Sequence, residues 1–151
     1  MTLHADSPVA GCPQDLWREP DRDERALWEE ARVVAARAYA PYSGFHVGAV
    51  VSAGAGLSYC GVNVENASYP VGLCAERAAL AAAVAAGERR FAALAVATAD
   101  GRDAAPCGAC LQALGEFGDL EIVAQVGDEV RVAPLRALLT TPFQAPEAPR
   151  A

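Results

Sequence analysis

Apolar residues recur over residues 21–40 at the three- and four-residue spacing of an α-helix. Asp21 precedes this stripe and Glu24 follows three residues later, which is the spacing of a capping box with Asp in place of Ser or Thr. Pro41 disfavours helical geometry in the residue before it, so we predict a helix that begins after Asp21 and ends by Pro41. Its apolar stripe comprises Ala26, Leu27, Ala31, Val34, Ala35 and Ala38.

The rest of the chain alternates between strand and helix patterns. FHVGAVVSA and LSYCGVNV are typical of strands, and the AGAG between them supplies turn residues, which predicts a hairpin. FAALAVATA is apolar on both faces, as a central strand would be. CAERAALAAAVAAG predicts a helix that Gly87 ends, and Pro106 is expected to open a helix over CGACLQALGEF. EIVAQV and VRVA predict two more strands, and Pro134 opens a last short helix.

This order of elements predicts an α/β fold, a three-layer α/β/α sandwich with a mixed sheet of about five strands. The opening hairpin is antiparallel, and strands joined through helices are expected to be parallel with right-handed crossovers. We predict one domain over residues 21–143. Residues 1–20 and 144–151 are expected to be a mobile N-terminal extension and a mobile tail.

Charge and composition exclude several classes of function. The formal net charge is −7 and the chain contains no lysine, so it lacks the basic surface that nucleic acids require. The missing lysine also excludes Schiff-base and P-loop chemistry. No run of eighteen apolar residues occurs, and the first twenty residues lack the features of a secretion signal. We therefore expect a cytoplasmic protein that acts on a small molecule, without a nucleic-acid or membrane partner.

Three of the five cysteines stand at predicted helix starts. Cys107 and Cys110 are three residues apart and so lie on one helical face, where both can coordinate one ion. Zinc takes thiolate ligands in a tetrahedral arrangement, and a catalytic zinc keeps one position open. With Cys74 as the third ligand, the fourth position is left for water. An odd number of cysteines in a reducing compartment makes a disulfide framework unexpected.

The neighbours of Cys74 fit catalysis at such a metal. Helix N-termini favour thiolate over thiol, yet three thiolates and Zn²⁺ leave one net negative charge. Arg77 is the candidate cation that offsets it. Glu76 is the candidate catalytic proton carrier, provided that Cys74 lies at the helix boundary, because residues two apart within a helix do not face the same way.

From the residues alone, two non-catalytic interpretations of these cysteines stay open. A CxxC pair is found in redox proteins, but that interpretation explains neither Cys74 nor Glu76. A structural zinc site normally has four protein ligands, and Cys12 or Cys60 could supply the fourth.

The segments AYAPYSGFHVGAVV, NVENASYPVGLCAERAAL and PCGAC resemble the small three-cysteine type of cytidine deaminase, in the same order and over about residues 25–143. The resemblance implies one zinc per subunit and hydrolysis of cytidine or deoxycytidine to the uracil nucleoside and ammonia. It also implies a homotetramer whose sites are completed by neighbouring subunits. In this family the residue after the second cysteine of PCxxC is commonly an arginine that helps to neutralise the site. Here that residue is Leu111.

The resemblance further implies a set of substrate-binding residues. Asn63 and Glu65 would hydrogen-bond the ribose, Phe45 would pack near the nucleoside, and the backbone of Ala75 would face the base. Phe143 would cap the pocket and Tyr69 would reach a neighbouring site. From the residues alone, Asn63 and Glu65 could instead satisfy a turn, and Phe45 could be a core aromatic.

Three other functions remain as alternatives. A deaminase of a modified cytosine nucleoside, such as blasticidin S, shares CAE and PCxxC but generally lacks the NVEN stretch present here. A deaminase of polynucleotides is disfavoured by the acidity of the chain. A zinc-stabilised binding module without catalytic activity is the third.

Overall fold

Five strands form one mixed sheet in the computed structural model, which describes residues 16–144. The strand order is β2-β1-β3-β4-β5, in which β3 and β4 are parallel and all other neighbours are antiparallel. This confirms the predicted mixed sheet and the central place of the doubly apolar strand, β3. The strands are β1 (Val47–Gly54), β2 (Leu57–Val62), β3 (Ala93–Thr98), β4 (Glu121–Val126) and β5 (Glu129–Pro134).

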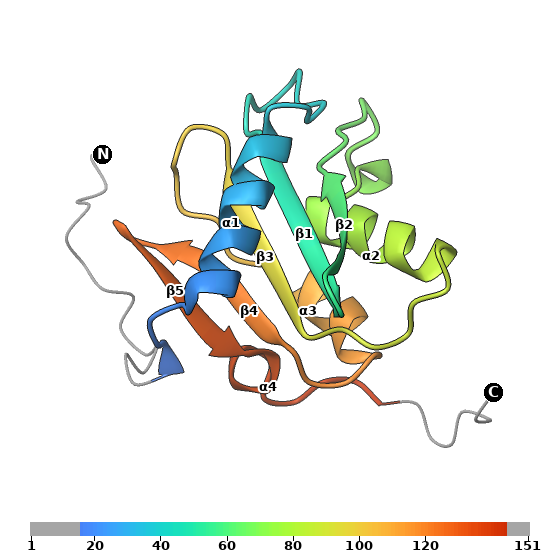
Figure 1. The fold of residues 1–151 in the computed structure, drawn as a ribbon. Coiled ribbons are helices and arrows are strands. Elements are labelled where there is room, and N and C mark those ends of the chain that lie inside the picture. Colours follow the sequence, from blue (N-terminus) through green and yellow to red (C-terminus); the bar gives the residue numbers. More distant parts are fainter. Residues whose placement is uncertain (1–15, 145–151) are drawn as a thin grey trace.

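Helices cover both faces of the sheet, which confirms the predicted three-layer sandwich (Figure 1). Leu94 and Val96 of β3 belong to the apolar cluster on the face of α2, α3 and α4. Ala95 and Ala97 belong to the cluster on the face of α1. The helices are α1 (Arg22–Ala35), α2 (Ala75–Ala85), α3 (Gly108–Gly115) and α4 (Leu135–Leu138), and a 3₁₀ turn, η2 (Tyr69–Val71), precedes α2.

The start of α1 is as predicted, and the helix ends before Pro41 but earlier than its predicted apolar stripe, which included Ala38. The Asp21 carboxylate accepts hydrogen bonds from the N–H groups of Asp23 and Glu24, and the Glu24 carboxylate accepts one from Asp21 N–H at 2.8 Å. The helix ends at Ala35, before Pro41, because the chain must become extended at Tyr39. Tyr39 N–H donates to Asn63 O at 3.1 Å, and Tyr39 O accepts from Glu65 N–H at 2.8 Å.

The two helices that carry the metal-binding motifs, α2 and α3, each have a cysteine at the N-cap position. Cys74 is the N-cap residue of α2, and Cys107 is the N-cap residue of α3. Helix α3 was expected to open at Pro106, so its true start at Gly108 is a correction of two residues. Pro106 instead stands before the cap, where it cannot interrupt a backbone hydrogen bond of the helix. The shift leaves the Cys107 side chain at the mouth of the helix.

The structure describes only part of the two predicted terminal segments. Trp17 packs against the core, and Arg18 exchanges two backbone hydrogen bonds of 2.9 Å with Val132 of β5. Of the predicted extension (residues 1–20) and tail (144–151), residues 1–15 and 145–151 lie outside the described residues. Within residues 16–144, no helix has the length and apolar character needed to cross a membrane.

A glycine in β2 allows α2 to approach the sheet closely. A Cβ atom built at Gly61 would lie 2.2 Å from Ala79 N and 2.6 Å from Ala75 O, both backbone atoms of α2. Real Cβ atoms are not found at such distances, and a helix backbone cannot yield as a flexible side chain can. Gly61 therefore fixes the depth at which α2, and with it Cys74, sits against the sheet.

Gly61→Ala should lower the free energy of unfolding by at least the ~1–3 kcal/mol typical of overpacking, because α2 must shift as a body. Urea denaturation measures the change. Gly115→Ala in α3 is the matched control, since its Cβ would lie 3.6 Å from the nearest atom, a side-chain carbon of Leu135. Equal stabilities of the two variants would contradict this account of Gly61.

Candidate metal and catalytic site

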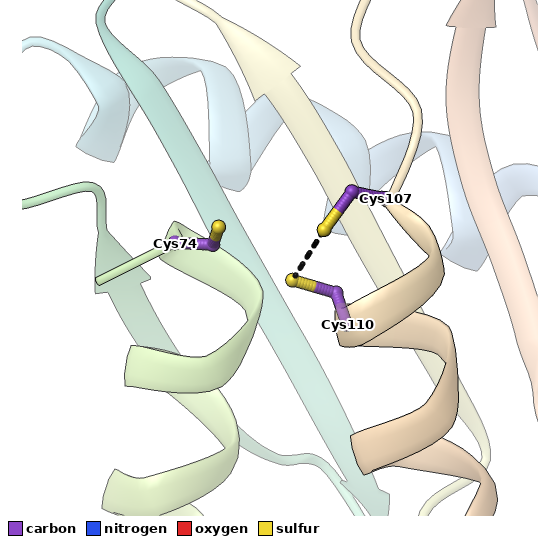
Figure 2. A group of neighbouring side chains, drawn as sticks. All are labelled: Cys74, Cys107 and Cys110. Carbon is purple, nitrogen blue, oxygen red and sulfur yellow. Dashed lines mark hydrogen bonds between the residues drawn. The ribbon is translucent and has the colours of Figure 1, made fainter. Parts of the chain in front are cut away.

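The sulfurs of Cys74, Cys107 and Cys110 all lie within 4.8 Å of one another, and those of Cys107 and Cys110 are 3.5 Å apart. Figure 2 shows the three side chains converging between the starts of α2 and α3. Zinc–sulfur bonds of ~2.3 Å in a tetrahedron place sulfurs about 3.8 Å apart. The spacing of the three thiols therefore fits one zinc ion.

The ionisation of these thiols depends on where they stand in α3. Burial opposes ionisation of Cys107, but the backbone N–H groups of Cys110 and Ala109 outweigh it and lower the pKa of the Cys107 thiol. Burial, together with the Glu76 carboxylate, raises the pKa of Cys110 well above its ordinary value. A divalent cation at the cluster would favour the thiolate at both positions, because a thiol that coordinates a metal is deprotonated.

A fourth cysteine ligand is not found in the described part of the chain. Cys60 is exposed on β2 and does not belong to the cluster, and Cys12 lies outside the described residues. Three protein ligands with an open fourth position are typical of catalytic zinc, whereas structural zinc usually has four. The geometry thus favours the catalytic interpretation.

Glu76 lies beside the cysteines at the wall of a cavity of about 280 Å³. Only 5% of the residue is exposed, and burial raises the pKa of its carboxyl group, while its own backbone N–H and the Cys110 thiol partly oppose the rise. Cys74 at the N-cap position satisfies the condition under which Glu76 can face the same space. The cavity is lined by Phe45, Val47, Asn63, Cys74, Ala75, Glu76, Val96, Asp103, Ala104, Ala105 and Cys107.

Arg77 is the guanidinium in contact with the cluster. Its Nη2 lies 3.9 Å from the Cys74 sulfur, and proximity to this sulfur raises the pKa of Arg77 further. Its Nε is buried and has no hydrogen-bond partner among the described residues. Leu111, where an arginine was expected, is 6% exposed and packs in the apolar core, so it brings no charge to the site.

The Asn63 side chain supports the start of β1. Its Nδ2 donates to Phe45 O at 2.8 Å, and its Oδ1 accepts from Val47 N–H at 2.8 Å. This is the structural role that the sequence left open for Asn63. An amide, however, has two donor hydrogens and two acceptor lone pairs. One of each is left over for a ligand, so a structural role and a binding role are compatible.

Glu65 and Tyr69 line a second, larger cavity of about 500 Å³, which shares Asn63 and Cys74 with the first. The Glu65 carboxylate accepts from Ser43 Oγ at 2.5 Å and from the N–H groups of Tyr42 and Ser43. The Ser43 hydroxyl and these N–H groups hold the pKa of Glu65 below its usual value. Tyr69 is 78% exposed, and its ring meets Tyr42 edge-on with centroids 6.3 Å apart.

Comparisons with known proteins fit this arrangement. Residues 21–126 match the family model described as the cytidine and deoxycytidylate deaminase zinc-binding region. The chain belongs to this family. It is 40% identical over 131 residues to a cytidine deaminase of Mycobacterium tuberculosis, which covers 87% of this chain and 97% of that protein. A second relative, a cytidine deaminase of Sporosarcina psychrophila, is 44% identical over 95 residues, or 63% of this chain and 70% of that protein.

Solved structures agree. The crystal structure of a cytidine deaminase from Burkholderia pseudomallei superposes with a TM-score of 0.73 at 46% identity, covering 79% of this chain and 98% of that one. The cytidine deaminase structure from M. tuberculosis gives a TM-score of 0.72 at 38% identity, covering 83% and 100%. The resemblance inferred from the three motifs is thereby confirmed.

Of the substrate-binding residues predicted for this deaminase, Phe143 alone lines neither cavity. It is 76% exposed, and its backbone N–H and carbonyl both pair with the Gln112 side chain on α3. Its capping role stays a prediction, and within one chain no contact with the cavities supports it.

Five residues of the smaller cavity were not predicted from the sequence. Asp103, Ala104 and Ala105 come from the loop between β3 and α3, Val47 comes from β1 and Val96 comes from β3. Alanines in a loop carry no chemical signal. Their only clue was their position directly before Pro106 and Cys107.

Proposed function

We propose that the protein hydrolyses cytidine and deoxycytidine to uridine and deoxyuridine with release of ammonia. The observation that carries this proposal is the buried Glu76 carboxyl group beside three converging cysteines at a cavity of about 280 Å³. The family membership and the relatives named cytidine deaminases support it further. Free nucleosides as substrates would give the protein a role in pyrimidine salvage, and we expect it to act in the cytoplasm.

Cys74, Cys107 and Cys110 would hold one zinc per subunit. When bound, zinc supplies the Lewis acidity that makes water a competent nucleophile near neutral pH. Arg77, whose Nη2 lies 3.9 Å from the Cys74 sulfur, offsets the surplus negative charge of the three thiolates. The N-termini of α2 and α3 add their partial positive charge at the same place.

Glu76 carries protons during the reaction. Its carboxylate takes a proton from the attacking water as the oxygen bonds to C4 of the pyrimidine, and it delivers that proton to the amine as the C–N bond breaks and ammonia leaves. Burial raises the pKa of Glu76, which suits a group that must both accept and return a proton near neutral pH.

The cavity walls would position the nucleoside. Phe45 and Val96 offer apolar surface to the pyrimidine, and Ala75, as the first residue of α2, has a backbone N–H free of helical hydrogen bonding that can face the base. Asn63 and Glu65 keep unused hydrogen-bonding capacity for sugar hydroxyls. A KM for cytidine that Glu65→Gln leaves unchanged would remove Glu65 from this set.

A nucleoside suits these cavities better than a nucleotide. No basic side chain lines either cavity within residues 16–144, while Glu65 lines the larger and Asp103 the smaller. A phosphate would meet carboxylates without a compensating cation. The NVEN stretch, which supplies Asn63 and Glu65, favours ordinary nucleosides over a blasticidin-type substrate.

We propose a homotetramer in which neighbouring subunits complete each site. Large apolar side chains are exposed around the larger cavity, which supports a covering subunit there: Tyr39, Tyr42, Val64, Tyr69, Val71 and Leu73. Tyr69 would contribute to a neighbouring site, and Phe143 would cap one.

Light scattering should give the mass of four chains of 15.6 kDa each, because this much exposed apolar surface favours association. Tyr69→Asp and Val71→Asp, which place charge on that surface, should yield smaller species. The solvent-facing variant Val33→Asp on α1, where Val33 is 66% exposed, is the matched control. A monomeric wild-type protein would contradict the tetramer.

Purified zinc-loaded protein should convert cytidine and deoxycytidine, measured by the loss of ultraviolet absorbance, and should leave blasticidin S unchanged. Glu76→Gln should keep the fold and the metal but lower kcat by at least ~10²-fold, since proton transfer contributes ~10²–10⁴-fold. Glu116→Gln, at the end of α3, controls for the loss of one carboxylate. A wild-type protein that converts none of the three compounds would contradict the proposed function.

A further inference from the structure

The Arg102 guanidinium lies over the ring of Phe45, 4.6 Å from the ring centroid. Phe45 lines the smaller cavity, whereas Arg102 does not. The guanidinium therefore contacts the ring from outside the cavity and leaves the rest of the ring to the interior. Such a cation–π contact favours one orientation of the ring.

The same guanidinium joins two loops. Its Nη2 donates to Gly44 O at 3.2 Å, in the segment before β1, and its Nε pairs with Asp100 at 2.7 Å, in the loop after β3. The Arg102 backbone is itself held in place, because its carbonyl accepts a hydrogen bond of 2.7 Å from the buried Thr98 hydroxyl. Arg102 therefore links the segment before β1, which carries Phe45, to the loop after β3, which carries Asp103.

The loop that carries Arg102 continues directly into the site. Asp103, Ala104 and Ala105 line the cavity, and Cys107 follows two residues later. Asp103 accepts a hydrogen bond from Gly127 N–H at 3.2 Å, and Ala104 forms a bridge with Gln125, so β4 and its turn brace this wall. The backbone of Phe45 is held as well, because its N–H donates to Ser43 Oγ at 2.9 Å and its carbonyl accepts from Asn63 Nδ2 at 2.8 Å. The contact with Arg102 therefore acts on the ring, not on the backbone.

We propose that Arg102 is a positioning residue for the nucleoside, acting through Phe45; this rests on the proposed deamination of cytidine. Held by the guanidinium, the Phe45 ring presents an ordered apolar wall to the pyrimidine. Without it, the ring must lose rotational freedom when the ligand binds, which weakens binding. Arg102 has no hydrogen bond to Glu76 or to the three cysteines in the described structure, so proton transfer should proceed at its usual rate.

The competing interpretation is an ordinary surface ion pair. The side chains of Arg102 and Asp100 are each 52% exposed, and pairs of this kind add little to stability. That interpretation predicts no effect of Arg102 on nucleoside binding. It also assigns Asp100 and Arg102 equal importance, whereas the positioning role requires only the cation over the ring.

Arg102→Met keeps an unbranched apolar stem and removes the guanidinium with its charge. We expect KM for cytidine to rise about two- to fivefold, the range of an exposed cation–π contact, while kcat changes less than about twofold. Arg102→Lys, which keeps a cation near the ring, should fall between wild type and Arg102→Met. Asp100→Asn removes the ion pair but keeps an oxygen that can accept the hydrogen bond from Arg102 Nε, so it should leave KM unchanged, as should the surface control Arg22→Met. Zinc content and thermal unfolding are recorded for every variant.

A double-mutant cycle with Phe45→Leu shows whether Arg102 acts through the ring. Adding Arg102→Met to Phe45→Leu should raise KM no further, because the ring that Arg102 orders is already gone. The inference would be overturned if Arg102→Met raised KM equally in both backgrounds, or if Arg102→Met alone left KM unchanged. In either case, cytidine turnover by the wild-type protein would still uphold the proposed function. Absence of turnover by the wild type would overturn the proposed function instead, and this inference with it.

Discussion

Two helices that begin side by side on one face of the sheet bring three thiols within reach of a single ion. Cys74 is the N-cap residue of α2, Cys107 is that of α3, and Cys110 follows in the first turn of α3. The convergence depends on how deeply α2 lies against β2, which the missing side chain of Gly61 permits. Everything else in the site is arranged around this meeting point, from the buried carboxyl group of Glu76 to the loops that wall the cavity.

Charge is the main constraint on such a centre. Three thiolates around a divalent ion leave one net negative charge, which weakens the ion as a Lewis acid. The two helix N-termini and the Arg77 guanidinium offset this negative charge. Leu111, at the position where the family commonly has an arginine, packs in the apolar core and adds no charge.

Much of this arrangement could be predicted from local patterns. The capping box of Asp21 and Glu24, the doubly apolar strand β3 and the three cysteines each have a signal within a few residues. The end of α1 at Ala35 could not be predicted, because it is set by the pairing of Tyr39 with residues 63–65, more than twenty residues away.

The substrate side of the site depends on such distant contacts as well. Asn63 and Glu65 were predicted as ligands of the ribose, but their hydrogen bonds to residues 42–47 arise only when β2 returns beside β1. Arg102 and Asp103 stand in a loop without a motif, so the contact of Arg102 with Phe45 and the place of Asp103 at the cavity follow from the fold alone. Sequence patterns revealed the chemistry of the site, and tertiary packing determines its walls.

The central claim is that the three cysteines form an open, catalytic zinc centre. X-ray absorption at the zinc edge of the wild-type protein tests it most directly, because it counts the ligand atoms and their distances. The account predicts three sulfur ligands at ~2.3 Å and one lighter atom at ~2.0 Å. Four sulfur ligands would contradict it, since a fourth cysteine would close the position that water must occupy.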